Sequence, residues 1–300
     1  MLKTLPNDIH AAAQLLRELA NEYRISRSIT FEEEKHKYTM RYNGVDYSNK
    51  LMSTSNAYKK FKLPFDSISK SLKMCDGDEV KAMELRNQWA AKGLRSSTMG
   101  SYCHYHLEQY IYELYKHKDP SEIRMPDIGN PDDYLSNAIP MIEHGKSFVN
   151  WTSKIGAVII DTEAVMGCEE YELFGQADKF WLVRSKSGII GLLTTDWKTN
   201  QPNKFDVGPF TKNMLGPYQM LHDNAVGVYS VQLTMYSALF IKMINKMGYD
   251  LPYIGSIIVN LTPDYNLQYR VESGIYGVTK SVLENKLHLQ QWFDPKLYNQ

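Results

Sequence analysis

The stretch of sequence that decides the fold is GQADKFWLV at residues 175–183, followed after a short polar turn by IIGLLTTDWKT at residues 189–199. Both segments are rich in apolar, aromatic and β-branched residues, so they predict two antiparallel strands. Side chains alternate along a strand, and Asp196 and Lys198 therefore point to the same face. Asp178 lies on the first strand of the pair, at the level where the second strand ends.

The position of the turn decides how close the two acids come. A turn centred near Ser187 places Asp178 opposite Asp196, whereas a turn centred near Lys186 makes them diagonal neighbours, about 7–8 Å apart. Either register gathers two carboxylates and the amine of Lys198 on one face. Such a cluster is unfavourable unless it binds a divalent cation, and oxygen ligands suit magnesium or manganese. The chemistry that this arrangement predicts is metal-assisted hydrolysis of a phosphodiester.

An acid two residues before a lysine is not distinctive by itself. Four of the five examples in this chain are most simply solvated charges, and only Asp196–Lys198 ends an apolar strand beside a second acid-bearing strand. The other four are Glu33–Lys35, Glu79–Lys81, Glu284–Lys286 and Asp294–Lys296.

Three further motifs surround the strand pair. Upstream, Gly100, His104 and Glu108 follow one another at four-residue intervals on a predicted helix, which places them on one face. Glu163 closes the apolar run that begins at residue 156. Downstream, YSVQLTMYSAL at residues 229–239 predicts a helix that carries Gln232 and Tyr236 on one face.

Asp178 and the Asp196–Lys198 pair count as two motifs, and the three that surround them make five. In their order along the chain, these five motifs resemble the PD-(D/E)XK nuclease superfamily, in particular its RecB-like exonuclease branch. The segment ITFEEEKHKY at residues 29–38 and the loop from Lys198 to Tyr218 also look like phage-encoded members. The resemblance covers most of residues 28–275. It implies an α/β fold with a restriction-endonuclease-like core, in which helices flank a mixed central sheet.

The resemblance also implies a role for each motif residue. Asp178, Asp196 and Glu163 would be catalytic acids and metal ligands, although Asp161 and Glu169 compete with Glu163 for its role. His104 would be a further metal ligand, with His106 as an alternative out of step with Gly100. Lys198 would orient the attacking water or steady charge on the phosphoryl oxygens, and Glu108 would hold His104 or a backbone group. The implied cofactor is Mg²⁺, with Mn²⁺ as a substitute.

DNA contacts are predicted for Gln232 and Tyr236, which by resemblance touch the DNA backbone or order the site. Lys204 and Lys212 follow the Asp-Trp-Lys motif and, with a group of lysines between residues 59 and 73, would form a basic track for phosphates. Each of these side chains has a simpler reading, as a solvated lysine or as core packing of the helix. The formal net charge is zero, so a local cluster must supply any attraction to DNA.

Composition limits the class of protein. Three hundred residues with 43% hydrophobic and 23% charged residues predict a globular chain. The sequence shows no apolar run of membrane-span length and no signal pattern, which predicts a cytoplasmic protein, in the host cytoplasm if phage-encoded. Three cysteines are too few to ligate an iron–sulfur cluster, so none is expected.

Periodicity and turn residues divide the chain into three parts that we expect to form one compact unit. Residues 1–52 predict a helix at 7–24 and a β-hairpin at 28–48 that turns at Asn43-Gly44. Residues 53–152 predict a helical region, with helices at 53–62, 77–93, 97–117 and 133–152. Residues 153–300 predict the nuclease core, with strands at 155–163, 174–183, 189–198, 253–262 and 267–272 and helices at 226–248 and 277–293.

The leading functional prediction is a magnesium-dependent DNA exonuclease that acts on free single-stranded or resected ends in recombination, repair or replication. By resemblance, the region at 53–150 would form an arch that admits a free end. A structure-selective endonuclease and a non-catalytic DNA-binding accessory protein are the alternatives. A recombinase or a single-strand-binding protein is a possible partner, and no membrane contact is expected.

Overall fold

The strand pair that carries Asp178 and Asp196 lies at the centre of a six-stranded mixed sheet. The computed structural model describes residues 1–300 apart from 33–34, 36, 206, 210, 264–281 and 286–300. The strands run in the order β10-β9-β8-β7-β5, and β6 also pairs with β7. They are β5 (Met52–Ser53), β6 (Val158–Cys168), β7 (Leu173–Arg184), β8 (Ile190–Lys198), β9 (Tyr253–Asn260) and β10 (Val282–Asn285).

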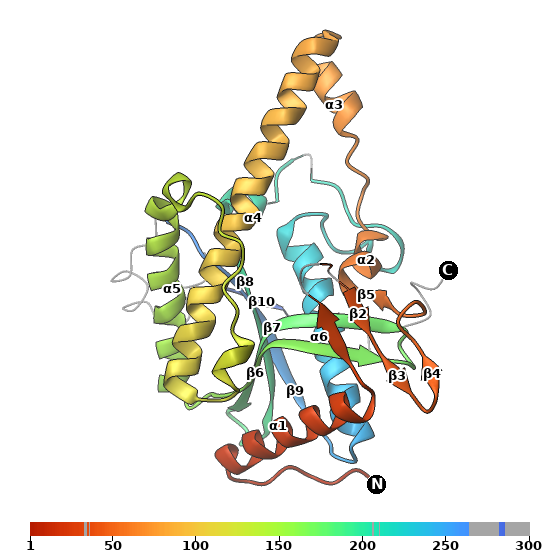
Figure 1. The fold of residues 1–300 in the computed structure, drawn as a ribbon, viewed down its shortest axis with the longest axis vertical. Helices are drawn as coiled ribbons and strands as arrows, with labels where there is room; N and C mark the ends of the chain where they lie inside the picture. Colours follow the sequence, from red (N-terminus) through yellow and green to blue (C-terminus); the bar gives the residue numbers. More distant parts are fainter. Residues whose placement is uncertain (33–34, 36, 206, 210, 264–281, 286–300) are drawn as a thin grey trace.

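Helices cover both faces of this sheet (Figure 1). Their bounds are α1 (Ile9–Ser26), α2 (Thr54–Lys59), α3 (Ser67–Met74), α4 (Glu79–Tyr115), α5 (Leu135–Lys154) and α6 (Ala225–Lys246). Polar side chains cap their first turns: Asp8 accepts a hydrogen bond from the Ala11 amide at 2.7 Å, and Asn224 accepts one from the Gly227 amide at 3.0 Å. The predicted class, an α/β protein with a mixed sheet flanked by helices, is confirmed at this level.

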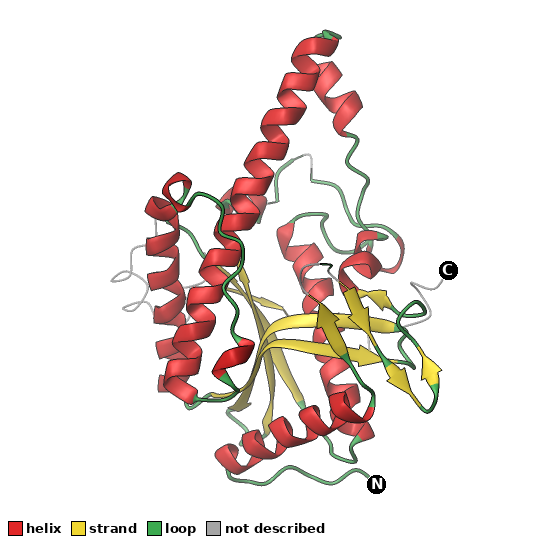
Figure 2. Cartoon of the chain, viewed as in Figure 1, coloured by secondary structure: helices red, strands yellow, loops and turns green. Residues whose placement is uncertain are grey.

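Alternation along the strands explains why two helical layers are needed. Ile160, Phe180 and Leu192 point into a core that α1 and α6 cover. Their chain neighbours Ile159 and Trp181 point into a second core that α4 and α5 cover. Because both faces of the central strands are apolar, neither face can be left to solvent. Figure 2 shows the resulting three layers, with the strands between the two groups of helices.

The strand β7 has different neighbours at its two ends. Its first residues, Leu173 and Phe174, pair in parallel with β5, and residues 179–184 pair antiparallel with β8. β6 pairs with β7 from Leu173 to Leu182, along most of its length. The sheet therefore divides along β7 at residues 175–178, and Asp178 lies where β8 separates from β7.

The helix α4 is longer than the sequence predicts. Helices expected at 77–93 and 97–117 are one continuous helix of 37 residues, about 55 Å long. Gly93 and Ser97 are weak helix formers, but the backbone stays helical through both. The Ser97 and Thr98 hydroxyls donate hydrogen bonds back to the Leu94 carbonyl without breaking the helix. The helix α3, capped by Asp66, was not predicted; it packs against α4, and the two project from the body (Figure 1).

Several other expectations are confirmed or corrected. The expected helices at 7–24, 133–152 and 226–248 correspond to α1, α5 and α6. The expected hairpin at 28–48 is instead two small ribbons, β1 (Thr30–Glu32) with β2 (Lys37–Thr39), and β3 (Arg41–Tyr42) with β4 (Val45–Asp46). The turn at Asn43-Gly44 joins the second ribbon. The expected strand at 267–272 lies outside the described residues. So does most of the expected helix at 277–293, whose described part is the strand β10.

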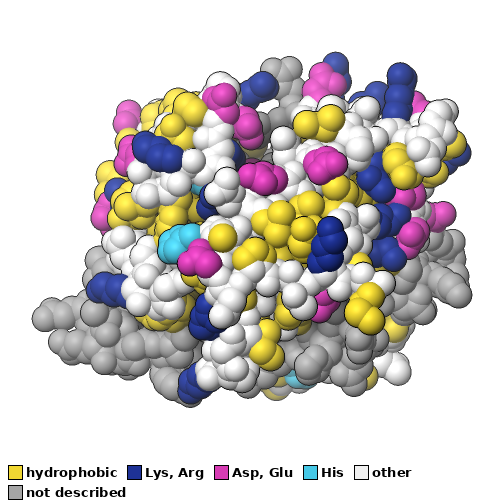
Figure 3. All heavy atoms as spheres, turned by 90° about the horizontal axis from the view of Figure 1, so that it is seen from below, with side chains coloured by type: hydrophobic (Ala, Val, Ile, Leu, Met, Phe, Trp, Pro, Cys, Tyr) yellow, Lys and Arg dark blue, Asp and Glu magenta, His cyan; other side chains and the backbone are white. Residues whose placement is uncertain are grey.

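The surface seen from below carries mixed charges. Basic and acidic side chains are interspersed among apolar ones across this face, so its described part has no dominant charge sign (Figure 3). Among the described residues, no helix has both the length and the apolar character required to cross a bilayer.

A close approach between β8 and β9 makes Gly191 essential to the sheet. A Cβ atom at Gly191 would lie 2.4 Å from the Pro252 carbonyl oxygen, which accepts a hydrogen bond from the Leu192 amide at 2.7 Å. We expect Gly191→Ala to lower the free energy of unfolding by about 1–3 kcal/mol. Urea unfolding followed by tryptophan fluorescence measures this change.

Gly255→Ala is the matched control. Gly255 lies on the adjoining strand β9, and a Cβ atom there would have no neighbour within 4 Å. We expect this variant to be neutral or slightly stabilising, because alanine restricts the unfolded chain. Equal destabilisation by both variants would contradict the steric explanation.

Candidate active site

Three acids lie in one row across three neighbouring strands. The pairs Thr162↔Lys179 and Ala164↔Ala177 place Glu163 on β6 level with Asp178 on β7. The pair Lys179↔Thr195 places Asp196 on β8 at the next position, also level with Asp178. This register corresponds to a turn centred on Ser187, one of the two predicted alternatives. The site therefore depends on strand register, which fixes all three carboxylates at the same height.

The separation of β7 and β8 directs Asp178 into the site. The last pair in the ladder is Lys179↔Thr195, and beyond it the Trp197 amide donates a hydrogen bond to the Asp178 carboxylate at 2.7 Å. This bond replaces a backbone partner that the separating strands no longer provide. It holds one oxygen of Asp178 beside β8, and the same oxygen faces His104.

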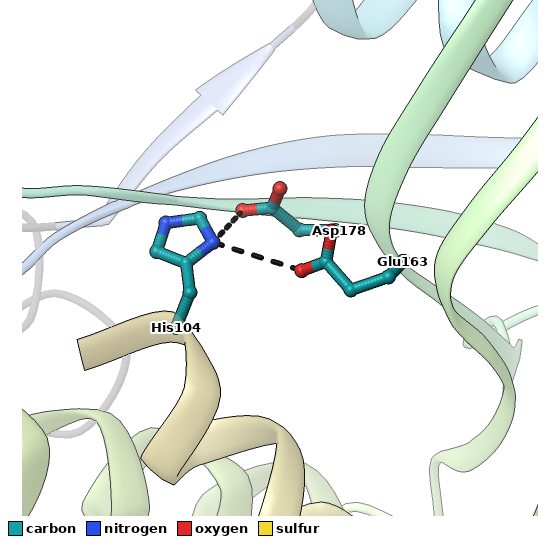
Figure 4. Close-up of side chains that lie close together, drawn as sticks. All are labelled: His104, Glu163 and Asp178. Atoms are coloured by element: carbon teal, nitrogen blue, oxygen red, sulfur yellow. Dashed lines mark ion pairs between the residues drawn. The ribbon is translucent and has the colours of Figure 1, made fainter. Parts of the chain in front are cut away.

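His104 reaches the acids from α4. Its Nδ1 lies 3.6 Å from the Asp178 Oδ2 and 3.7 Å from the Glu163 Oε1 (Figure 4). One ligand atom from each of these three residues lies within 4.8 Å of the other two, so together they could hold a metal ion. The predicted alternative His106 instead packs its ring against Tyr102 and Tyr105.

Gly100 explains how α4 comes so close to the sheet. A Cβ atom at Gly100 would lie 3.3 Å from the Thr199 hydroxyl oxygen, a tight contact just beyond the end of β8. A glycine here lets the helix approach the end of the strand. His104 lies one turn later on the same face of the helix, so the close approach at Gly100 brings its imidazole to the carboxylates.

Glu163 has an unusual backbone conformation. Its φ is +48°, in the left-handed region that non-glycine residues seldom adopt, although it lies inside β6 rather than at its end. The sequence had placed it at the end of the strand. Gln176 donates a hydrogen bond to its Oε2 at 3.2 Å, which helps to hold the carboxylate toward His104. Such local strain persists only where surrounding contacts hold it in place.

A polar network on the residue before Glu163 supplies such contacts. The Thr162 hydroxyl donates to the Glu108 carboxylate at 3.1 Å and lies 2.9 Å from the His117 Nε2. Lys118 forms an ion pair with Glu108 and donates to the Thr162 carbonyl at 3.2 Å. Glu108 therefore holds the side chains of Thr162 on β6 and of Lys118, and these contacts include neither of its predicted partners, His104 or a backbone group.

The competing acids are engaged elsewhere. Asp161 forms an ion pair with Arg24 of α1, and Glu169 forms one with Lys246 of α6. Neither belongs to the group of potential metal ligands. Of the three acids considered for β6, the structure brings Glu163 to His104 and Asp178.

Asp196 is beside the potential ligand group rather than within it. It is 1% exposed and forms an ion pair with Lys198, whose ammonium also lies over the Tyr229 ring, 4.4 Å from its centroid. Burial and the neighbouring Asp178 charge raise the pKa of Asp196 to about 6. Although burial opposes the charge on Lys198, the Asp196 and Asp178 carboxylates raise its pKa above the usual range. Without a cation, the lysine is therefore protonated.

The pKa values of the three potential ligands shift in different directions: that of Asp178 is lowered, and those of His104 and Glu163 are raised. Burial disfavours ionised Asp178, but His104, Lys179 and Lys198 outweigh burial and hold its pKa well below the usual range. Burial likewise disfavours a proton on His104, but Asp178 and Glu163 outweigh it and raise the pKa of His104. Burial raises the pKa of Glu163. The row therefore combines one firmly ionised acid with two acids that retain protons more strongly.

Lys179 also belongs to this site, although no motif in the sequence marks it. It is 2% exposed, its Nζ lies 3.8 Å from the Asp178 Oδ2, and it also lies over the Trp197 ring, 4.0 Å from its centroid. Burial lowers its pKa, and Asp178 partly offsets the effect. The sequence does carry one signal for Lys179. It is a lysine inside an apolar strand, directly before Phe180, where an unpaired charge would be costly.

The ligand group opens into a cleft of 920 Å³. His104, Glu163 and Lys198 line it, together with Trp89, Tyr105 and Arg124 from the helical region and its following loop. Lys204 lines this cleft and a second one, whereas Lys212 lines only the second. Glu163 is therefore the acid of the row that lines the open groove, which is large enough for an extended ligand.

Gln232 and Tyr236 lie beneath the site, within α6. They are 7% and 5% exposed, and the Gln232 amide donates to the Tyr236 hydroxyl at 2.8 Å. The Tyr236 ring would be about 3.0 Å from a Cβ atom at Gly175, so it packs closely against β7. This burial fits the predicted role of ordering the site, and direct contact with DNA remains a prediction.

The donor set fits a hard divalent cation. Carboxylates suit magnesium and manganese, and an imidazole shifts the balance toward manganese. Glu163, Asp178 and His104 would hold such an ion, and Asp196, which is level with Asp178 on β8, is the next carboxylate that could join them. A magnesium ion in proteins usually keeps several waters and few protein ligands, which this half-open group allows.

No protein-family model, no curated protein and no solved structure matches this chain.

Cation binding should stabilise the folded protein. At a concentration 100-fold above Kd, Mn²⁺ or Mg²⁺ would add about 2.7 kcal/mol, a rise in Tm of about 5 °C. Asp178→Asn should abolish this shift, because it removes the most strongly ionised ligand. Differential scanning fluorimetry with and without chelator measures it, and Glu143→Gln, on the exposed surface of α5, is the control. An undiminished shift in Asp178→Asn would exclude this site as the origin.

Protons should compete with the cation. Asp196 must lose a proton with a pKa of about 6, and His104 must be neutral to act as a ligand. Below pH 6 the acid is increasingly protonated, so we expect the Kd for Mn²⁺ to rise about tenfold between pH 7.5 and pH 5. Isothermal titration calorimetry in buffers of different ionisation enthalpy measures the Kd and the protons released. A constant Kd without proton release would argue against Asp196 and His104 as ligands.

Proposed function

We propose that this protein is a metal-dependent nuclease of the PD-(D/E)XK type that hydrolyses DNA phosphodiesters, as an exonuclease acting on free ends. The observation that carries the proposal is the row Glu163, Asp178 and Asp196 on three adjacent strands, flanked by His104 and Lys198. The strand order and the order of the motifs in the chain support it. Mg²⁺ is the proposed cofactor, and Mn²⁺ would substitute.

The proposed reaction adds one water across a phosphorus–oxygen bond. The water oxygen joins phosphorus, the bond to the 3′ oxygen breaks, and that oxygen takes up a proton, leaving a 5′-phosphate and a 3′-hydroxyl. A bound cation would neutralise phosphate charge and lower the pKa of a water. Glu163, Asp178 and His104 would hold the cation and orient it relative to the strand.

Lys198 has a distinct role in this proposal. Its ammonium lies against Asp196 and above Tyr229, at the border between the acids and the cleft. A protonated lysine there would stabilise negative charge that develops on the phosphoryl oxygens. Asp196 and Asp178 raise the pKa of Lys198, so the lysine keeps its proton. This argues against Lys198 as the base that accepts the proton of the attacking water.

An exonuclease of this kind would suit a role in recombination, repair or replication. It would act in the cytoplasm, with a recombinase or a single-strand-binding protein as its partner. A structure-selective endonuclease and a binding-only protein are the competing possibilities. A protein that only binds DNA has no need for a buried acid such as Asp196, whose ionisation is opposed by burial and by Asp178. The cost of that charge favours catalysis.

End-labelled digestion tests the proposal. We expect magnesium-dependent loss of linear DNA labelled at either the 5′ or the 3′ end, with no loss of circular single strands. Asp178→Asn and Lys198→Ala should each lower the rate by more than about 100-fold, because both remove charge that acts on the phosphate. Lys186→Ala, in the β7–β8 turn at the other end of the strands, is the matched control.

The possible results discriminate among the three functions. Cleavage of circular single strands as fast as linear ones would favour an endonuclease. Binding of DNA without cleavage, in either Mg²⁺ or Mn²⁺, would favour the binding-only function. Full activity of Asp178→Asn would remove the site from the mechanism altogether.

A further inference from the structure

A second cleft continues the groove of the candidate active site. Its volume is 850 Å³, and it shares Asn200, Lys204 and Tyr229 with the first cleft. These three residues follow the Asp-Trp-Lys motif or lie on α6, so the junction is directly beside Lys198. Four lysines line the second cleft: Lys62, Lys70, Lys204 and Lys212.

The walls of this lysine cleft are fixed to one another. One wall comes from α2 and the segment that leads to α3, and the other from the loop after β8 and the start of α6. The Leu63 amide donates to the Asp223 carboxylate at 2.8 Å, and the Leu215 amide donates to the Phe61 carbonyl at 2.7 Å. The Phe61 and Tyr218 rings pack edge to face, 4.9 Å between centroids. The cleft is thus formed before any ligand binds.

The lysine cleft carries a strong excess of positive charge. Among the described residues, none of its four lysines forms an ion pair with a carboxylate. Asp223 is the one acid among the described lining residues, and its carboxylate accepts the Leu63 amide. The chain as a whole has no net charge, and the face in Figure 3 mixes both signs. The excess is therefore local to the groove that leads to the metal site.

Aromatic side chains accompany these lysines. Tyr58 and Tyr229, both partly exposed, line the lysine cleft, and Trp89 and Tyr105 line the first cleft. A groove that combines cationic side chains with aromatic rings is suited to an unpaired strand, whose backbone follows the charges while its bases stack. A duplex keeps its bases stacked on one another and cannot use such rings.

We propose that the lysine cleft binds the phosphates of an unpaired DNA strand, next to the nucleotide whose phosphodiester lies at the metal site. The inference rests on the proposed function, because it identifies the substrate as a single strand and assigns its path. Lys204 lies at the junction and Lys62, Lys70 and Lys212 lie farther along. The strand would pass between α2 and the loop after β8, over Tyr229.

Fluorescence anisotropy in the presence of chelator tests this path without cleavage. The probe is a labelled single-stranded oligonucleotide, and the variant is Lys62→Gln with Lys70→Gln and Lys212→Gln. For single strands, each lost phosphate contact lowers the salt slope of log K by about 0.7. We therefore expect affinity to fall at least tenfold at low salt and the slope to decrease by about 2.

The control replaces three lysines far from the groove: Lys3→Gln with Lys154→Gln and Lys186→Gln. It makes the same change in net charge. Lys3 lies near the start of β9, Lys154 lies before β6, and Lys186 lies in the β7–β8 turn. Affinity and salt slope in the control should stay near the wild-type values. Equal losses of affinity in both variants would show that net charge alone explains the loss, and would overturn the proposal. Wild-type affinity in the cleft variant would overturn it as well.

Two further results separate this inference from the proposed function. Strand binding that depends on the cleft lysines, in a protein that cleaves no DNA with Mg²⁺ or Mn²⁺, would support the path while contradicting the nuclease. Cleavage by the wild type, with unchanged strand binding by the cleft variant, would contradict the path alone. Duplex DNA bound as tightly as single strands through the same lysines would overturn the assignment of an unpaired strand.

Discussion

The repulsion among three carboxylates on neighbouring strands is the constraint on which the rest of the site depends. Glu163, Asp178 and Asp196 are level with one another, and Asp196 is almost fully buried. Burial removes the water that would otherwise screen their charges. The protein balances the row with His104 on one side and Lys198 on the other, but the pKa of Asp196 is still raised, so the balance is incomplete. A divalent cation would complete it.

The fold creates this constraint through the division of its sheet. β7 exchanges β5 for β8 as its neighbour, and the acids gather where this exchange occurs. The same division frees the Trp197 amide for Asp178. On the opposite side, the missing side chain at Gly100 lets α4 approach the end of β8 and deliver His104. Backbone geometry, more than the acids themselves, assembles the site.

The parts of this arrangement that follow from local periodicity were predictable. Alternation put Asp196 and Lys198 on one face, and the composition of the turn limited the position of Asp178 to two registers. The left-handed backbone of Glu163 and its support by Lys118 were not predictable, because they depend on the pairing of β6 with β7 and on the end of α4. The continuity of α4 was likewise not predictable from propensity, because Gly93 and Ser97 are both weak helix formers inside it.

The separation of acids and lysines into two connected clefts gives each a different task. Carboxylates repel a phosphate unless a cation is bound, so the acid row by itself cannot capture a strand. Lys62 and Lys212 lie outside this row and line the lysine cleft. Capture would then depend on salt, and cleavage on the cation. Both operate along a single groove because Lys204 and Tyr229 belong to both clefts.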